Sequence, residues 1–317
     1  MRIHGYNVTI YDRYDRAGGL LTYGIPDFKL EKSVITRRIE RLKRADIQFI
    51  HGCDIGNTLP FDELQERPDA ILIATGVYQA RGLQLTGLEE KNYIPALDFL
   101  IASNKVNFGD SIPEIQDSEG ALNVEGKHVV GIGGGDTAMD CVRTAVRRGA
   151  GSVTCLYRRD RENMPGSKRE VNNALEEGVK FEFLANPKAV ITDSSGKPKS
   201  LIVARMRLGQ KDVTGRQTSQ EIPDSNFTIN ADMIIGALGF EPEDLPTLFN
   251  CPNLTVTQWG TVKTNNHTGE TSVSGVFAAG DIVRGASLVV WAIKDGRDIA
   301  KHIMAYLKQK KESDNAF

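Results

Sequence analysis

The sequence predicts an α/β protein made of two Rossmann-like domains, with one domain inserted into the other. Apolar strands alternate with helical patterns, a glycine-rich turn joins one such strand to a helix, and acidic or glycine residues follow strands near both ends of the chain. Alternating strands and helices favour parallel sheets with right-handed crossovers. A length of 317 residues is enough for two domains of ordinary size.

The composition is that of an ordinary globular protein and argues against several kinds of partner. Hydrophobic residues make up 40% and charged residues 25%, and the net charge of -2 argues against a dominant surface for nucleic acid. The apolar stretches Ala70–Thr75 and Leu288–Ile293 are far shorter than a membrane span. The four cysteines form no C-x-x-C motif, so zinc and iron–sulfur sites lack local support. We expect a cytoplasmic protein without a metal site.

Four segments precede the glycine-rich turn. A strand is expected at Val8–Tyr11 and a helix at Ser33–Ala45, where apolar residues recur at helical spacing. Ala70–Ala74 is a continuous apolar run that predicts a buried strand. Val106–Leu122 is rich in Gly, Pro, Asp and Ser and predicts a connection.

A regular α/β pattern follows this connection. Strands are expected at His128–Ile132 and Ser152–Tyr157, with a helix at Asp136–Arg148 between them. Ser167 and Glu170 have the spacing of a capping box at the start of the next helix. The remaining expected elements are a strand at Val179–Leu184, a hairpin of Lys188–Thr192 with Leu201–Leu208, strands at Ala231–Leu238 and Gly275–Ala279, a helix from about Ser287 to Leu307, and a loose polar tail from Lys308.

The glycine-rich turn has the pattern of a dinucleotide-binding loop. Gly133-Gly134-Gly135-Asp136-Thr137-Ala138 fits G-x-G-x-x-A, and it follows an apolar strand and opens a helix. Gly133 permits a tight turn, Gly135 lets the backbone approach a pyrophosphate, and Ala138 allows close packing of helix on sheet. The helix N-terminus presents free N–H groups to the phosphates. Gly239, after a later strand, is counted with these cofactor-binding residues.

The end of the next strand distinguishes between the two nicotinamide cofactors. A site for NAD usually has an acidic side chain there, which holds the ribose 2′-hydroxyl. Here the strand ends in Tyr157-Arg158-Arg159. Guanidinium groups bind a 2′-phosphate through charge-assisted hydrogen bonds. Although an isolated arginine pair is usually a solvated loop, its position after the glycine loop predicts NADPH.

Three further segments have features of a flavin site. Asp12, at the end of a strand, is placed to accept a hydrogen bond from an adenosine ribose. The glycines and leucines of Gly18–Pro26 suit a flat ring. Asp281 is a candidate for the ribityl chain, and the helix that begins near Ser287 can aim its N-terminus at the flavin. The expected flavin-binding residues are Asp12, Gly18, Gly19, Leu20, Gly24, Thr75, Gly76, Gly280, Asp281, Ser287 and Leu288.

Four long stretches carry a family resemblance. They are Gly18–Lys32 (GGLLTYGIPDFKLEK), Gly133–Ala145 (GGGDTAMDCVRTA), Tyr157–Glu170 (YRRDRENMPGSKRE) and Gly275–Arg297 (GVFAAGDIVRGASLVVWAIKDGR). The chain resembles the small (beta) subunit of NADPH-dependent glutamate synthase, in the glutathione-reductase-like flavoprotein superfamily. The resemblance implies FAD as the second cofactor, hydride transfer from NADPH to FAD, and a large (alpha) subunit as the partner that makes glutamate from glutamine and 2-oxoglutarate.

The sequence departs from this family at its beginning. The family has a cysteine-rich domain for iron–sulfur clusters and a first G-x-G-x-x-G fingerprint for FAD, and neither is present here. We therefore expect an N-terminally truncated chain that lacks the first βα unit of the FAD domain, with weakened FAD binding. The predicted organisation is an incomplete first part of the FAD domain at 1–122, an NADPH domain at 123–240, a second FAD part at 241–310 and a flexible tail at 311–317.

The functional prediction is an NADPH-oxidising flavoprotein subunit of glutamate synthase. No catalytic side chain is expected, because the cofactors carry the chemistry and the protein orients them. Two alternatives stay open. The chain is a nucleotide-binding module without turnover, or a related flavoprotein reductase with another electron acceptor.

Overall fold

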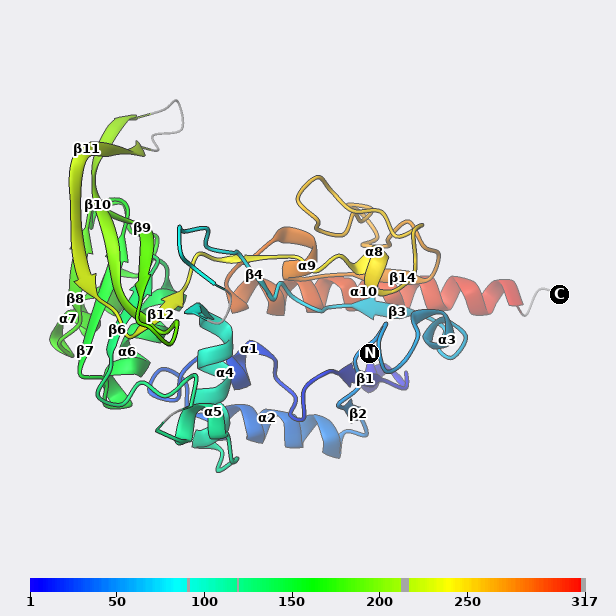
Figure 1. Ribbon diagram of the computed structural model, residues 1–317. Helices are drawn as coiled ribbons and strands as arrows, with labels where there is room; N and C mark the ends of the chain where they lie inside the picture. The colour runs from blue at the N-terminus through cyan, green and yellow to red at the C-terminus, as the bar shows by residue number, and fades with distance from the viewer. Residues whose placement is uncertain (90–91, 119, 212–216, 315–317) are drawn as a thin grey trace. The chain divides into compact units, whose positions relative to one another are not determined.

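The computed structural model describes residues 1–89, 92–118, 120–211 and 217–314 (Figure 1). These residues divide into two compact units. Unit 1 consists of residues 1–22, 32–79 and 240–317, and unit 2 consists of residues 23–31 and 80–239. Within the described ranges, no helix combines the length and the apolar character needed to cross a membrane.

Unit 2 is built on a parallel sheet of five strands. In spatial order they are β5 (Ile94–Pro95), β12 (Met233–Gly236), β6 (His128–Ile132), β7 (Ser152–Tyr157) and β8 (Lys180–Phe183). The two central strands β6 and β7 have the residues predicted from the sequence. Their continuous apolar character follows from burial on both faces of the sheet.

The two faces of this sheet have different coverings. Helices α4 (Ala96–Asn107), α6 (Asp136–Arg147) and α7 (Lys168–Glu176) pack on one face. An antiparallel sheet of β9 (Ala185–Thr192), β10 (Pro198–Lys211) and β11 (Gln217–Asn230) packs on the other. Alternation along β6 serves both layers, since Val129 belongs to the helical side of the core and Val130 to the other side.

Unit 1 contains two pairs of parallel strands. β1 (Thr9–Asp12) pairs with β2 (Gln48–His51), and β3 (Ile71–Ile73) pairs with β14 (Val276–Ala278). A two-stranded ribbon of β4 (Gln79–Ala80) and β13 (Phe240–Glu241) lies where the chain passes between the units. The other elements described in the first and last parts of the chain are η1 (Arg2–His4), α1 (Leu20–Tyr23), α2 (Lys32–Arg44), α3 (Phe61–Gln65), α8 (Leu245–Leu248), α9 (Asp281–Arg284) and α10 (Val289–Asp314).

The core of unit 1 is assembled from segments far apart in the sequence. Phe61 and Phe249 stack with ring centroids 4.6 Å apart. On α10, Ile299 and Ile303 pack against Phe277 of β14. Burial of such side chains contributes roughly 1.5–3 kcal/mol each. The first and last parts of the chain are thus held together by apolar packing.

Several sequence predictions need correction. The predicted connection from Val106 contains the end of α4 and the short helix α5 (Pro113–Gln116). The predicted hairpin is a sheet of three strands, because β11 pairs along β10. The tail predicted from Lys308, and given as flexible from residue 311, is helical as far as Asp314, and its last three residues lie outside the described ranges.

Unit 2 also differs in extent from the NADPH domain predicted at 123–240. It begins at Ala80, because β5 pairs with β12 and α4 packs on α6. It also includes the distant segment Tyr23–Glu31. Strand pairing and helix packing of this kind are long-range contacts that local sequence patterns do not report.

Candidate functional site

The glycine loop follows β6 and leads directly into α6. Gly133 has a φ of +146°, and a side chain there would approach the carbonyl oxygen of Ala237 to 2.3 Å. A side chain at Gly134 would approach the ring of Tyr157 to 2.4 Å. Both positions therefore require glycine for the fold of unit 2 itself.

Gly135 is different, because its surroundings are open. It is the N-cap residue of α6, with a φ of -89°, and no atom lies within 4 Å of a side chain placed there. As a glycine, it has no side chain with which to cap this helix N-terminus. Ala138, one turn later, is 1% exposed and belongs to the helical side of the core. The loop thus offers open space beside a helix N-terminus, which is the arrangement that binds phosphates.

The arginine pair lies at the same edge of the sheet as the glycine loop. β6 and β7 are parallel neighbours with Ile132 opposite Leu156, so Arg158 follows its strand beside the glycine loop. Arg158 is exposed, and its side chain forms no hydrogen bond or ion pair with the described part of the chain. Arg159 donates from Nε to the Tyr157 hydroxyl at 3.1 Å. Arg158 is therefore the guanidinium more available for a ligand.

The segment after these arginines folds back onto the glycine loop. The Gly166 amide donates to the Gly134 carbonyl at 2.9 Å, and the Ser167 amide donates to Asp136 Oδ1 at 2.9 Å. Sequence reasoning gave Gly166 no role. Its only signal was the Pro165-Gly166 pair, which marks a turn. These bonds fix the arginine-bearing loop relative to the glycine loop.

The capping box predicted for α7 is wrong in its chemistry. Ser167 occupies the N-cap position, but its side chain makes no capping hydrogen bond. Glu170 instead accepts a hydrogen bond from Arg143 Nη1 at 2.5 Å. A nearby arginine outcompetes the local backbone amide for that carboxylate, since charge-assisted bonds are the stronger ones.

In unit 1, Asp12 lies at the carboxyl end of β1, as predicted. Its Oδ1 accepts a hydrogen bond from the Tyr14 amide at 3.0 Å. Burial raises the pKa of Asp12 above its usual value, and the Tyr14 bond only partly offsets this. The neighbouring Arg13 forms two hydrogen bonds with Glu243, at 2.8 and 2.5 Å. The Glu243 bond raises the pKa of Arg13, so this guanidinium stays charged.

The predicted ring-binding stretch begins with two constrained glycines. Gly18 has a φ of +117°, and a side chain there would approach Thr22 Oγ1 to 2.3 Å. Gly19 has a φ of +53°, and a side chain there would approach the Tyr78 hydroxyl to 3.0 Å. Tyr78 was missed by sequence reasoning, and burial raises its pKa. Both positions therefore favour glycine.

Two predicted flavin residues carry buried oxygens without a partner. Thr75 Oγ1 follows β3, Asp281 Oδ1 follows β14, and neither atom has a hydrogen-bond partner in the described part of the chain. Burial raises the pKa of Asp281, and a hydrogen bond from the Ser287 amide opposes this shift. Unpartnered buried polar atoms are costly and call for a partner. Gly280, which directly precedes Asp281, has a φ of +79° and open space around it. These features fit a polar cofactor in unit 1.

The remaining predicted residues are placed as follows. Gly24 is buried, and Leu20 and Gly76 are half-buried. Gly239 has a φ of +97° with open space beside it, and Ser287 and Leu288 are exposed just before α10. A hollow of about 760 Å³ runs along α2, and no predicted site residue lines it. Among the described residues, no group of three or more His, Cys, Asp or Glu side chains is arranged to hold a metal ion.

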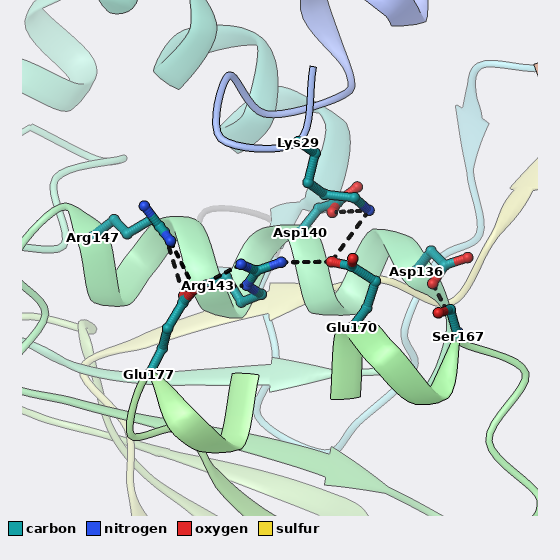
Figure 2. Close-up of polar contacts among 8 residues, drawn as sticks. All are labelled: Lys29, Asp136, Asp140, Arg143, Arg147, Ser167, Glu170 and Glu177. Carbon is teal, nitrogen blue, oxygen red and sulfur yellow. Dashed lines mark hydrogen bonds and ion pairs between the residues drawn. The ribbon is translucent and has the colours of Figure 1, made fainter. Parts of the chain in front are cut away.

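A buried charge network on α6 and α7 was also missed by sequence reasoning. Lys29 Nζ lies 2.7 Å from Asp140 Oδ1 and 3.7 Å from Glu170 Oε2 (Figure 2). Arg143 bonds both Glu170 and Glu177, the latter at 2.6 Å. Burial raises the pKa of Asp140 to about 6, although the Lys29 bond acts in the opposite direction. The network links residues 111 positions apart, so no local motif reports it.

Comparisons with known proteins agree with this architecture. The pyridine nucleotide-disulphide oxidoreductase family matches residues 4–296. A putative glutamate synthase (NADPH) small chain of Cereibacter sphaeroides is 57% identical over 309 residues, which are 98% of this chain and 73% of the relative. A glutamate synthase (NADPH) small chain of Azospirillum brasilense is 54% identical over 313 residues, which are 99% of this chain and 64% of the relative.

A solved structure gives the same fold. FprA of Mycobacterium tuberculosis in complex with NADPH superposes with a TM-score of 0.76 at 19% identity, covering 97% of this chain and 79% of FprA. An identity this low shows the fold alone. The family match and the two relatives carry the assignment further. The chain belongs to the pyridine nucleotide-disulphide oxidoreductase family and, within it, to the small chains of NADPH-dependent glutamate synthase.

Proposed function

We propose that the chain is the NADPH-oxidising, FAD-dependent subunit of a glutamate synthase. Its electrons pass to a large subunit that forms glutamate from glutamine and 2-oxoglutarate. The observation that carries this proposal is the identity of 57% and 54% to glutamate synthase small chains over nearly the whole of this chain. The chain spans about two thirds to three quarters of the length of those relatives.

The edge of the sheet in unit 2 is the proposed NADPH site. The open space at Gly135 and the uncapped start of α6 receive the pyrophosphate. Arg158 and Arg159 bind the 2′-phosphate. The bonds of Gly166 and Ser167 to the glycine loop hold the arginines in place without being contacts to the cofactor. Preorganisation of this kind reduces the entropy lost on binding.

Unit 1 is the proposed FAD site. The unpartnered oxygens of Thr75 and Asp281 supply hydrogen-bonding capacity for the cofactor, and Asp12 lies where a ribose would be held. The stretch that begins at Gly18 and Gly19 positions the ring. Bound flavin would supply the chemistry of accepting a hydride and passing on electrons. The side chains of this protein bind and orient the cofactor and need not transfer a proton.

Reconstitution with a large subunit tests the proposal. The purified chain, supplied with FAD, is mixed with a glutamate synthase large subunit, NADPH, glutamine and 2-oxoglutarate, and glutamate is measured. Glutamate that depends on both chains and on NADPH supports the proposal. NADPH oxidation with a dye but no glutamate would assign another electron acceptor. Binding of NADP⁺ without any oxidation would identify a nucleotide-binding module without turnover.

A further inference from the structure

The segment Tyr23–Glu31 belongs to unit 2, although 48 residues of unit 1 separate it from the rest of that unit in the sequence. It follows directly on the glycine–leucine stretch that begins at Gly18. The chain therefore enters and leaves unit 2 at both ends of this short segment, in addition to the crossings near residues 79 and 239. Such a detour requires specific contacts that hold the segment in unit 2.

One anchor lies at the start of the segment, on α4. Asn104 Nδ2 donates to the carbonyl oxygens of Tyr23 at 2.8 Å and of Ile25 at 3.2 Å. Asn104 is 2% exposed and Tyr23 is 1% exposed. The Tyr23 ring also lies edge-on to Phe108, with centroids 6.3 Å apart. Buried hydrogen bonds of this kind are expensive to leave unmade, so the backbone here is firmly fixed.

A second anchor lies at the end of the segment, on α6. Lys29 forms a hydrogen bond with Asp140, whose side chain is 9% exposed. The Phe28 ring lies beneath the guanidinium groups of Arg143 and Arg147, with centroid distances of 4.6 and 4.3 Å. Cation–π contacts add to the ion pair. Asp140, Arg143 and Arg147 all lie on α6, the helix whose N-cap residue is Gly135.

The charge balance of this anchor is shared with α7. Arg143 pairs with Glu170 and Glu177, and its side chain is 7% exposed. Lys29 therefore completes a set in which each buried charge has an opposite charge beside it (Figure 2). Removing Lys29 leaves the Asp140 carboxylate without the opposite charge beside it, which is strongly unfavourable in a buried site. Lys29 is the member that comes from the distant segment.

We propose that Lys29 and Asp140 are a positioning pair for hydride transfer. They fasten the segment that continues the proposed flavin stretch onto the helix whose first turn forms the proposed NADPH site. The pair touches neither cofactor. It fixes where the segment Tyr23–Glu31 is held on α6 within unit 2, and the rate of hydride transfer depends steeply on such placement. This inference rests on the proposed function.

The test compares Lys29→Ala with the conservative Lys29→Arg. Amide hydrogen exchange of the full chain is measured over residues 23–31, together with NADP⁺ binding and, with FAD supplied, NADPH-to-dye turnover. In Lys29→Ala we expect roughly tenfold or faster exchange in the segment, since local stability sets exchange. We also expect kcat to fall roughly tenfold while KM for NADPH and the Kd for NADP⁺ change less than about twofold. Lys29→Arg should restore most of the loss.

A matched control is Arg205→Ala, which removes an exposed ion pair with Glu182 and a cation–π contact with Phe227 in the same unit. It should change none of these readouts. Unchanged exchange in Lys29→Ala would overturn the anchoring, and faster exchange with unchanged kcat would overturn the positioning role. A tenfold loss of NADP⁺ affinity would also overturn it, since the pair would then belong to the nucleotide site. If the unmodified chain shows no turnover, the proposed function fails, while exchange and NADP⁺ binding still decide the anchoring.

Discussion

At the scale of single residues, neighbouring glycines in one loop have different tasks. Gly133 and Gly134 are surrounded by Ala237 and Tyr157, so they serve the packing of unit 2. Gly135 has open space beside it, so its lack of a side chain leaves room for a ligand. The arginines after β7 differ in the same way. Arg159 is bonded to Tyr157, whereas Arg158 is exposed.

Removal of both arginines should separate the two nicotinamide cofactors. We expect the double variant Arg158→Ala with Arg159→Ala to weaken NADPH binding by about 10–100-fold, because charge-assisted bonds to the 2′-phosphate are lost. NADH has no such phosphate, so its binding should change little. Titration calorimetry with both cofactors measures this. Arg161→Ala is the control, since Arg161 is bonded to Asn172. Equal losses for NADPH and NADH would contradict the assignment.

The buried carboxyl of Asp140 gives a prediction about pH. Its pKa is raised from 3.8 to about 6 by burial, so as the pH falls the folded chain takes up a proton before the unfolded chain does. Its contribution to the free energy of unfolding therefore increases as the pH falls through about 6. Relative to Asp140→Asn, the unmodified protein should gain about 1 kcal/mol between roughly pH 7.5 and pH 5. Denaturant unfolding at several pH values measures the difference.

The exposed Asp298 provides the comparison for that experiment. Its bonds with Lys294 and Lys301 lower its pKa, so its contribution is present above its usual pKa and is lost as the pH falls. Relative to Asp298→Asn, the unmodified protein should therefore lose a small part of its free energy of unfolding as the pH falls. A pH-independent difference between Asp140→Asn and the unmodified protein would show that Asp140 keeps its ordinary pKa when folded.

At the scale of elements, the sequence is most informative where strands are buried on both faces. β6 and β7 have the predicted residues because their runs are apolar and bounded by clear turns. β11 was missed because most of its side chains are exposed and polar, so no apolar pattern marks it. It is a strand because it pairs with β10, a contact that the local sequence of β11 does not indicate. Tertiary context commonly overrides local β-propensity.

The candidate site shows the same division. The glycine loop and the arginines were predictable because a local motif fixes them to the ends of β6 and β7. The Lys29–Asp140 pair was not, because it joins residues from distant segments. The capping box of Ser167 and Glu170 was predicted wrongly, since Arg143 takes the glutamate. Short motifs do not report such competition.

Two adjacent glycine substitutions should separate folding from binding in the loop. Gly134→Ala forces a methyl group against the Tyr157 ring, and overpacking of this kind costs about 1–3 kcal/mol. Gly135→Ala meets open space and should cost at most about 1 kcal/mol as a change of N-cap residue. Its methyl group occupies the proposed pyrophosphate site, so NADP⁺ affinity should fall at least roughly tenfold. Thermal unfolding with and without NADP⁺ measures both effects. If Gly135→Ala binds NADP⁺ with unchanged affinity, the pyrophosphate does not bind at this loop.

At the scale of the whole molecule, the two units have different internal organisation. Unit 2 has a continuous five-stranded sheet covered on both faces. In unit 1 the described parallel strands form two separate pairs, and Ile10 and Leu72 are 37% and 40% exposed on them. In the proposed function, NADPH therefore binds at the edge of a fully formed sheet. The flavin would be bound by loops and by the unpartnered oxygens of Thr75 and Asp281.

The proposed function requires that this chain holds a flavin that NADPH reduces. The most direct measurement is the visible absorbance spectrum of the purified chain after incubation with FAD and removal of the excess, followed by addition of NADPH. We expect a bound flavin spectrum that NADPH bleaches, and bleaches faster than NADH does at equal concentration. A colourless protein that binds NADP⁺ would contradict the claim and leave unit 2 as a nucleotide-binding module without turnover.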